Sequence, residues 1–487
     1  MLFNSLQFCV FFPVVTLLYF FLPHRFRWML LLAASCLFYM AFIPYYICIL
    51  LVTTLVDYSV AIQLEKYEGA RRRLLIASSI IVNVGFLAFF KYFNFINTNI
   101  SEFARLIHWN YSIENLAIIL PIGLSFHTFQ AMGYTIDVYR RQQKPERHFG
   151  IFALYVMFYP QLVAGPIERS QNLIHQFYEK HVPDYARIAS GLKLMLWGLF
   201  KKVVIADRVA VVVNQVYNNP HDYSGLPFVI ATVFFAFQIY CDFSGYSDIA
   251  VGAAEVMGFK LMKNFDRPYF SKSIAEFWKR WHISLSTWFR DYLYIPLGGS
   301  RTTAARWQFN LFITFLVSGL WHGANWTFVI WGALNGFYLV FSLWTADIRK
   351  RVTDATGISR LPQLHKGIKV LITFCLTCVT WVFFRAANVH DALYILQHMF
   401  DGWNSMIDLN VVRNSLSAMA INKTEFIIAL FFILILQAVH IMQRRGSVRE
   451  MLETKPLWLR WPLWYALALI VILFGYYNSS PFIYFQF

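Results

Sequence analysis

Long apolar runs separated by short polar or basic segments extend along the whole chain. Most runs are close to the ~20 residues that an α-helix needs to cross the hydrocarbon core of a bilayer. The run at 311–344 is long enough for two helices, so the pattern predicts about 11–12 crossings. We therefore expect an all-α polytopic membrane protein with additional re-entrant or interfacial helices. The expected spans lie at residues 6–22, 28–42, 45–63, 74–96, 116–138, 188–217, 226–256, 311–344, 367–385, 424–442 and 462–478.

Basic residues cluster in alternate loops and predict the orientation of the first spans. Positive charges gather at residues 24–27, 65–73 and 140–147, whereas the polar segment at 97–115 carries only Arg105. Because cytoplasmic loops are enriched in Lys and Arg, the basic loops should face the cytoplasm. Both ends of the chain and the mixed segment at 386–423 are then expected on the extracytoplasmic side.

A histidine interrupts the longest apolar run. Two helices should meet near Trp321-His322-Gly323, which places His322 inside the bilayer, where ionisable groups are costly and often functional. The alternative is a histidine that only bonds a neighbouring backbone carbonyl. Gly319 and Gly323 flank His322 and permit close backbone approach beside the imidazole. On a continuing helix Asn325 would share the face of His322 and could orient the ring or hold a substrate oxygen.

Residues 264–303 predict an amphipathic segment on the cytoplasmic side. From Ser273 onward apolar residues recur at helical spacing, so we expect one interfacial helix with Lys279 and Arg280 on its polar side. Ser273 and Glu276 have the spacing of a capping box. His282 lies at the edge of the apolar stripe. That stripe consists of Ile274, Phe277, Trp278, Trp281, Leu285, Trp288 and Phe289.

Charged and proline-rich stretches interrupt the middle of the chain. The sequence YPQLVAGP at 159–166 suggests a re-entrant or interfacial segment within 148–185. Lys201-Lys202 and Asp207-Arg208 interrupt 188–217, so this helix should face a polar cavity or lie partly in the interface. Asp242 and Asp248 within the 226–256 span need partners. We favour structural hydrogen bonds over a metal site, since no histidine or third acid lies nearby in the sequence.

Composition supports the membrane class. Hydrophobic residues make up 58% of the chain and charged residues 14%, which excludes an ordinary soluble domain. The net charge of +16 resides in clusters between apolar spans, so we attribute it to membrane orientation and not to nucleic-acid binding. The six cysteines lie in or beside apolar segments, and we interpret Cys375 and Cys378 as core residues and not as a metal or redox pair.

Several motifs together resemble the membrane-bound O-acyltransferase family. Within that family the chain is similar to the branch that contains the alginate O-acetylation protein AlgI and the teichoic-acid D-alanylation protein DltB, with AlgI the better fit. The resemblance covers nearly the full length and predicts a single membrane domain over residues 1–487, with a catalytic helix pair at 307–345. The motifs are YPQLVAGP (159–166), YCDFSGYSD (240–248), NFDRPY (264–269), WKRWHISLS (278–286), WHGANW (321–326), WVFFR (381–385) and PFIYFQF (481–487).

The resemblance implies an enzyme of the bacterial cytoplasmic (inner) membrane. It would take an acetyl group from a cytoplasmic donor, acetyl-CoA or another acyl thioester, for O-acetylation of an extracytoplasmic polysaccharide such as alginate. No tightly bound cofactor or metal is expected. Its expected partners are the lipid bilayer, an extracytoplasmic acetyltransferase and an acyl carrier. The alternatives are D-alanyl transfer to teichoic acid and a non-catalytic transporter or scaffold of a polysaccharide export complex.

Three residues are expected to carry the reaction. His322 matches the catalytic histidine of the family and His282 its second histidine, and a neutral imidazole suits the removal of a proton from an attacking hydroxyl. In the tail at 479–487, Tyr484 alternates with Phe482 and Gln486 and could carry the acyl group; the alternative is an aromatic membrane anchor. We expect substrate contacts from Trp321, Asn325, Trp326, Arg267, Lys279 and Arg280, and a basic donor entrance that also includes Lys263 and Arg290.

Overall fold

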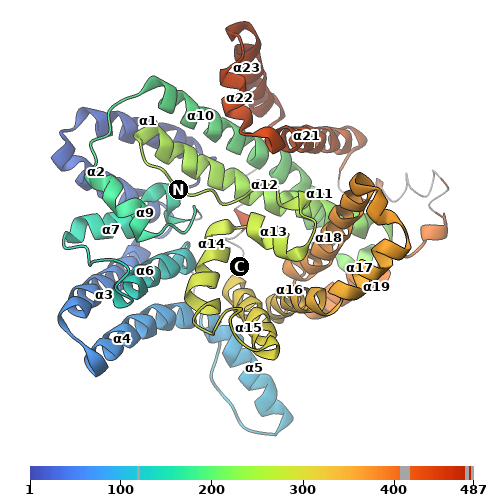
Figure 1. The fold of residues 1–487 in the computed structure, drawn as a ribbon, viewed down its shortest axis with the longest axis horizontal. Coiled ribbons are helices and arrows are strands. Elements are labelled where there is room, and N and C mark those ends of the chain that lie inside the picture. The colour runs from blue at the N-terminus through green and yellow to red at the C-terminus, as the bar shows by residue number, and fades with distance from the viewer. Residues whose placement is uncertain are drawn as a thin grey trace. The chain divides into compact units, whose positions relative to one another are not determined.

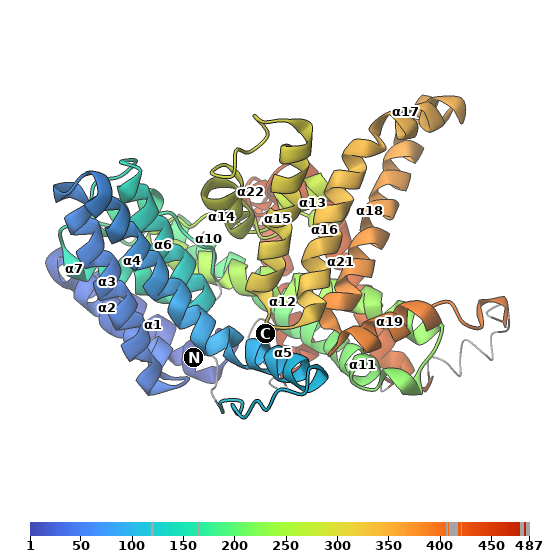
Figure 2. The same ribbon diagram turned by 90° about the horizontal axis from the view of Figure 1, so that it is seen from below.

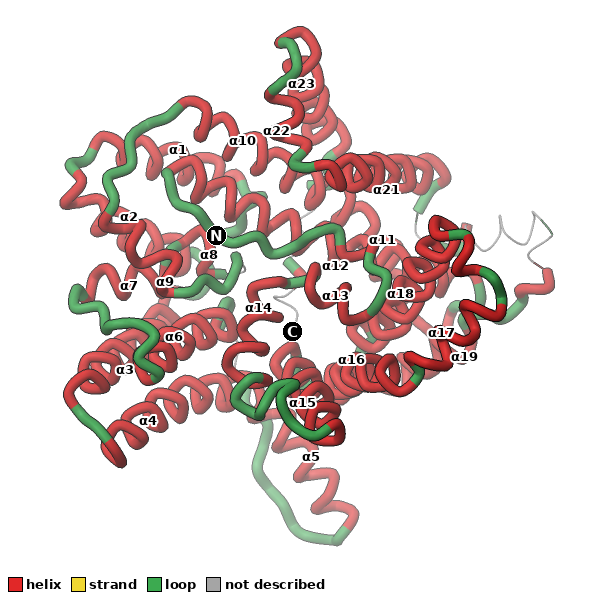
Figure 3. The backbone as a smooth tube through the Cα atoms, viewed as in Figure 1, coloured by secondary structure: helices red, strands yellow, loops and turns green. Residues whose placement is uncertain are grey.

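The computed structural model describes residues 1–117, 121–163, 165–405, 408, 417–419, 421–477 and 482–483. Helices and loops account for all of this part of the chain, with no strand in it (Figure 3). The all-α prediction is therefore confirmed. The chain divides into two compact units: unit 1 comprises Met1–Met195 and Tyr246–Lys263, and unit 2 comprises Leu196–Gly245 and Asn264–Phe487.

A bundle of apolar helices forms most of unit 1. Within it α3, α4 and α6 lie side by side (Figure 1). A buried carboxylate joins them: Asp57 on α3 accepts hydrogen bonds from Ser79, from Asn83 Nδ2 at 2.9 Å and from Thr135 Oγ1 at 3.1 Å. The helices of this unit are α1 (Leu6–Phe21), α2 (His24–Met40), α3 (Ile47–Lys66), α4 (Gly69–Leu87), α5 (Phe93–Leu106), α6 (Leu124–Tyr139), α7 (Phe149–Met157), α8 (Tyr159–Leu162), α9 (Ser170–Leu173) and most of α10 (Tyr185–Leu199).

One boundary in unit 1 differs from the sequence-based expectation. The polar segment expected at 97–115 is helical as far as Leu106, because α4 continues through a π-helical turn at Ala88–Tyr92 into α5. Asn97 on α5 bonds to the polar segment that follows the helix: its Nδ2 donates to the carbonyl of Ile113 at 3.1 Å. The segment at 148–185 contains the short helices α7, α8 and α9, and α7 is buried from Gly150 to Met157.

In unit 2, α15 and α16 form an antiparallel pair, and α18 packs against α16 (Figure 2). The helices of this unit are α11 (Asp207–Asn218), most of α12 (Leu226–Met257), α13 (Ile274–Arg280), α14 (Ile283–Phe289), α15 (Ala304–His322), α16 (Trp326–Trp344), α17 (Ala346–Ala355), α18 (Pro362–Arg385), α19 (Val389–His398), α21 (Lys423–Met442), α22 (Val448–Glu453) and α23 (Leu457–Phe474).

Seven helices in the described part of the chain are long and apolar enough to cross a membrane. The chain is therefore a multi-pass membrane protein, as the hydrophobic pattern predicts. Other expected spans correspond to shorter helices, such as the 16 residues of both α1 and α6. The seven lie at Pro44–Lys66, Gly69–Leu106, Leu226–Met257, Trp326–Trp344, Pro362–Arg385, Lys423–Arg445 and Leu457–Phe474.

Candidate active site

The predicted helix pair meets at the Trp-His-Gly sequence. α15 ends at His322 and α16 begins at Trp326. Glycines bring the two backbones together: a Cβ atom on Gly319 would lie 2.3 Å from the carbonyl oxygen of Phe328, and one on Gly332 would lie 2.5 Å from that of Phe315. No other residue type fits at that separation without a shift of backbone, so the prediction of close approach beside the imidazole is confirmed.

Asn325 differs from its expected position because the helix does not continue past His322. Asn325 is the N-cap of α16, and its Oδ1 accepts from the backbone N–H of Thr327 at 3.0 Å. Its Nδ2 donates to the carbonyl of Ala387 at 2.9 Å. A side chain that caps a helix satisfies backbone donors that would otherwise have no partner. Asn325 therefore ties the start of α16 to the α18–α19 connection instead of sharing a helix face with His322.

Aromatic rings surround His322, which is 5% exposed. Its ring centroid lies 4.9 Å from that of Trp321, 4.9 Å from that of Trp331 and 5.4 Å from that of Phe384. All three contacts are close to perpendicular, an arrangement typical of aromatic pairs. Phe384 belongs to the WVFFR motif at the end of α18, so three helices supply this shell. Trp326, by contrast, is 53% exposed.

His282 lies at a break in the segment that the sequence predicts to be one amphipathic helix. That prediction is wrong: α13 ends at Arg280, α14 begins at Ile283, and His282 has a left-handed backbone with φ of 44°. The apolar stripe is buried as expected. The Ser273 cap is confirmed, since its Oγ accepts from the N–H of Glu276 at 3.1 Å. Glu276 in turn accepts from the N–H of Lys272 at 2.8 Å, one residue before the capping-box position.

The NFDRPY segment holds the break in place. The carbonyl of Asn264 accepts from the N–H of Ile283 at 2.9 Å, and its Oδ1 accepts from Ser284 Oγ at 2.9 Å. Asp266 N–H donates to the carbonyl of Arg280 at 2.9 Å. His282 is 1% exposed, and burial lowers its pKa to about 3. The imidazole of His282 is therefore neutral at physiological pH.

Trp321 connects the two histidines. Its ring centroid lies 6.4 Å from that of His282 and 4.9 Å from that of His322. The structure therefore brings together the two expected catalytic histidines and one expected substrate residue. Phe243 of α12 also packs against His282, with ring centroids 4.6 Å apart.

A cavity of about 500 Å³ opens beside α13, α14 and the α15–α16 pair. Lys279 and Arg290 supply its positive charges, and Ser318, one helical turn before His322, also lines it. His322 itself is not part of the lining. Three residues of the expected entrance are in ion pairs: Arg290 with Asp291 at 2.7 Å, Arg280 with Glu276 at 2.7 Å and Arg267 with Asp266 at 3.0 Å. Lys263 belongs to unit 1.

Two of the charges that interrupt residues 188–217, Lys202 and Asp207, form a buried network with Asp242 within unit 2. Lys202 Nζ lies 2.8 Å from Asp207 Oδ1 and 2.8 Å from Asp242 Oδ1. The lysine is thus paired with two carboxylates inside the protein and needs no polar cavity. Structural hydrogen bonding by Asp242, the interpretation that the sequence favours, is confirmed. The sequence contains both partners but gives no indication that they meet.

Asp242 of this network also bonds to the chain near its C-terminal end. Ile483 N–H donates to Asp242 Oδ2 at 2.8 Å, and the side chains of Phe482 and Ile483 are 1% and 2% exposed. Phe482 packs against Phe243, with ring centroids 5.8 Å apart. Tyr484, the expected acyl carrier, lies outside the described residues.

Comparisons with known proteins agree with one another. The family model "MBOAT, membrane-bound O-acyltransferase family" matches residues 146–386. The chain is 38% identical over 409 residues to "Probable alginate O-acetylase AlgI" of Pseudomonas aeruginosa, covering 82% of this chain and 75% of that protein. It is 36% identical over 396 residues to "Peptidoglycan O-acetyltransferase" of Helicobacter pylori, covering 76% of this chain and 73% of that protein. It is 28% identical over 287 residues to "Teichoic acid D-alanyltransferase" of Streptococcus thermophilus, covering 54% of this chain and 68% of that protein.

Proposed function

Because the chain belongs to the membrane-bound O-acyltransferase family, we propose that it transfers acetyl groups from a cytoplasmic thioester for O-acetylation of an extracytoplasmic polysaccharide. The donor is acetyl-CoA or another acyl thioester, and the acceptor is alginate or a related glycan. The observation that carries this proposal is a buried histidine at a helix junction, one turn beyond a basic cavity. The enzyme would act in the bacterial cytoplasmic membrane beside an extracytoplasmic acetyltransferase.

His322 is the proposed general base. A hydroxyl attacks a thioester carbonyl efficiently only when its proton is removed, and a neutral imidazole is suited to that step. The aromatic rings of Trp321, Trp331 and Phe384 pack around the imidazole and hold it in place for that step. The shell also excludes water, so the thioester is protected from hydrolysis.

The cavity is the proposed donor site. Coenzyme and carrier thioesters bear phosphates, which pair with cationic side chains. Lys279 and Arg290 line the cavity, and Ser318 also lines it one helical turn before His322. A thioester arm that enters beside the two cations would extend along α15 toward the imidazole. Trp321 would then contact the acyl end of the donor, because its ring centroid lies 4.9 Å from that of His322 and 6.4 Å from that of His282.

Tyr484 is the proposed acyl carrier. His322 would remove the phenolic proton, the phenolate oxygen would attack the thioester carbonyl, and the thiolate would leave and take up a proton. The acyl ester on Tyr484 would then pass to the extracytoplasmic partner. Support comes from the preceding residues: Ile483 is bonded to Asp242, and Phe482 packs on Phe243, the neighbour of His282.

The acetyl group is favoured over D-alanine as the cargo. The two acetyl-transfer relatives match more than three quarters of this chain, whereas the D-alanyltransferase matches 54% at lower identity. Measuring release of free CoA from labelled acetyl-CoA, and of phosphopantetheine carrier from a D-alanyl thioester, in parallel would separate the two donors.

The decisive experiment uses the purified full chain in proteoliposomes. Transfer of label from acetyl-CoA should fall by about 10²–10⁴-fold in His322→Ala, the usual effect of losing a general base. His365→Ala is the matched control, because His365 lies at the start of α18 away from the cavity lining. Equal transfer by His322→Ala and the wild type would favour a scaffold or transporter.

Tyr484→Phe tests the carrier separately, because it removes one oxygen and retains the ring. We expect loss of acid-stable label on the protein and loss of polysaccharide O-acetylation. Unchanged O-acetylation by this variant would leave His322 as the base for another hydroxyl acceptor and return the tail to a membrane-anchoring role.

A further inference from the structure

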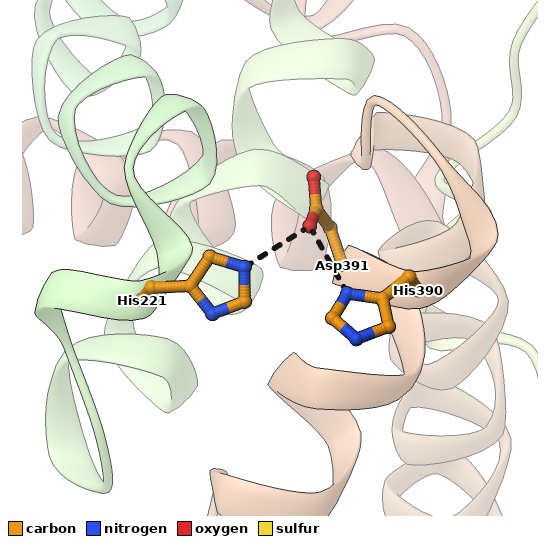
Figure 4. A group of neighbouring side chains, drawn as sticks. All are labelled: His221, His390 and Asp391. Atoms are coloured by element: carbon orange, nitrogen blue, oxygen red, sulfur yellow. Dashed lines mark ion pairs between the residues drawn. The ribbon is translucent and has the colours of Figure 1, made fainter.

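A cluster of two histidines and an aspartate lies in unit 2, apart from the His322 shell. His221 belongs to the short 3-10 turn Pro220–Asp222 after α11, whereas His390 and Asp391 occupy the first turn of α19. One ligand-capable atom from each residue lies within 4.8 Å of the others. Figure 4 shows the two imidazoles on either side of one carboxylate oxygen.

The distances are close to those of a metal coordination sphere. His221 Nε2 lies 3.5 Å and His390 Nδ1 lies 3.8 Å from the same Asp391 Oδ1. In a tetrahedral zinc site with bonds of ~2.0–2.2 Å, neighbouring ligand atoms are separated by about 3.4 Å. Small side-chain rotations would therefore bring all three atoms to bonding distance of one ion. Two imidazole nitrogens and a carboxylate oxygen are ligands that favour Zn²⁺ over Mg²⁺ or Ca²⁺.

Surrounding contacts orient the ligands. Asp391 Oδ2 accepts from Asn388 Nδ2 at 2.8 Å, which leaves Oδ1 directed at the histidines. The ring of His221 packs on Tyr394, with centroids 4.4 Å apart. The N–H of Gly225 donates to the carbonyl of His398 at 2.8 Å and fixes the turn against α19. Metal ligands in proteins are commonly held by such outer-shell hydrogen bonds.

A simple ion pair explains less of this arrangement. Asp391 is also an acid in the first turn of a helix, where the helix dipole favours negative charge. That role requires neither histidine, and one protonated histidine would suffice for an ion pair. The side chains of His221 and His390 are 55% and 82% exposed while Asp391 is 16% exposed, so an ion here would have three protein ligands and a fourth position open to water.

We propose that His221, His390 and Asp391 bind a divalent transition metal of the Zn²⁺ type. The ion would link the turn after α11 to the start of α19. That start follows Ala387, whose carbonyl accepts from Asn325, the cap of α16. The metal would therefore stabilise the α18–α19 connection at the end of the helix pair that bears His322. The inference stands independently of the proposed acetyl donor and acceptor.

Zinc binding to the full-length, tag-free protein in detergent tests the proposal. Equilibrium dialysis with ZnCl₂ should give one ion per chain, and His221→Ala and His390→Ala should each weaken binding at least tenfold. His175→Ala is the matched control: His175 Nε2 lies 3.8 Å from Glu179 in an exposed pair, and this pair is not part of any three-ligand cluster among the described residues. Its binding should equal that of the wild type.

One further variant tests the outer shell, and a second measurement separates metal binding from folding. Asn388→Ala should weaken zinc binding by about tenfold, the usual effect of losing an outer-shell partner. Saturating Zn²⁺ should raise the unfolding temperature of the wild type and of His175→Ala but not that of His221→Ala. Absence of stoichiometric zinc binding by the wild type, or equal binding by both ligand variants and the wild type, would overturn the proposal.

Discussion

His322 and His282 are both buried and both contact Trp321, but the chain holds them by different means. His322 is the last residue of a regular helix, and its position depends on how closely α15 and α16 pack at Gly319 and Gly332. His282 lies at a helix break with a left-handed backbone, and its position depends on hydrogen bonds that Ile283 and Ser284 donate to Asn264.

This difference indicates which substitutions should displace each imidazole. A residue at the end of a regular helix moves only if the helix moves, so substitutions at the α15–α16 contact should affect His322 together with overall stability. A residue at a break between two helices moves when the hydrogen bonds that hold the break are removed. Substitution of Asn264 should therefore affect His282 with a smaller effect on the rest of unit 2.

The largest expected effect is the loss of kcat on replacing the histidines, and it also tests whether the two act as one unit. His322→Ala alone should lower kcat by about 10²–10⁴-fold. Adding His282→Ala should then change kcat little, because residues that act together are non-additive. Acetyl transfer in proteoliposomes by the two single variants and the double variant measures this. Losses that multiply would assign the histidines to independent roles.

Gly319→Ala tests the helix contact that positions His322. The added Cβ would lie 2.3 Å from a backbone carbonyl, so the unfolding free energy should fall by about 1–3 kcal/mol as expected for overpacking. Gly367→Ala on α18 is the control, because no atom lies within 4 Å of its Cβ position. Thermal unfolding in detergent should show a lower Tm for the first variant and an unchanged or higher Tm for the second.

Asn264→Ala tests the break that positions His282. Ser284 N–H and Oγ would both lose the acceptor Oδ1, at a cost of about 1–3 kcal/mol for the buried groups. The displaced His282 should lower kcat while KM for the donor changes little. Steady-state kinetics at several acetyl-CoA concentrations separates the two constants. An unchanged kcat would mean that the break forms without Asn264 or that His282 has no part in the reaction.

The smallest expected effect concerns donor affinity at the cavity. Combined Lys279→Glu and Arg290→Glu should raise KM for acetyl-CoA by about tenfold and reduce its dependence on salt, since cation–phosphate contacts are screened by ions. Lys366→Glu, an exposed charge outside the cavity lining, is the control and should leave KM unchanged. If both variants behave alike, the donor enters elsewhere.

Patterns local in the chain account for the parts that were predicted correctly. Apolar runs define the spanning helices, the glycines flanking His322 predict the tight α15–α16 contact, and Ser273 predicts the start of α13. The glycines and the cap act within one or two helical turns, and each spanning helix follows from one continuous run of residues. The spacing of apolar residues over 274–289 likewise predicts correctly which side chains are buried, although it does not reveal the break at His282.

The sequence by itself determined an all-α membrane protein, its family, and the histidine at the centre of the longest apolar run. Only the tertiary structure decided that Asn325 bonds to Ala387, that Asn264 holds the break at His282, that Lys202 pairs with Asp242, and that His221 meets Asp391. The physical reason is the range of the interactions. Hydrophobic periodicity and capping act between near neighbours in the chain, whereas these hydrogen bonds and ion pairs form between segments that approach only when the helices have packed.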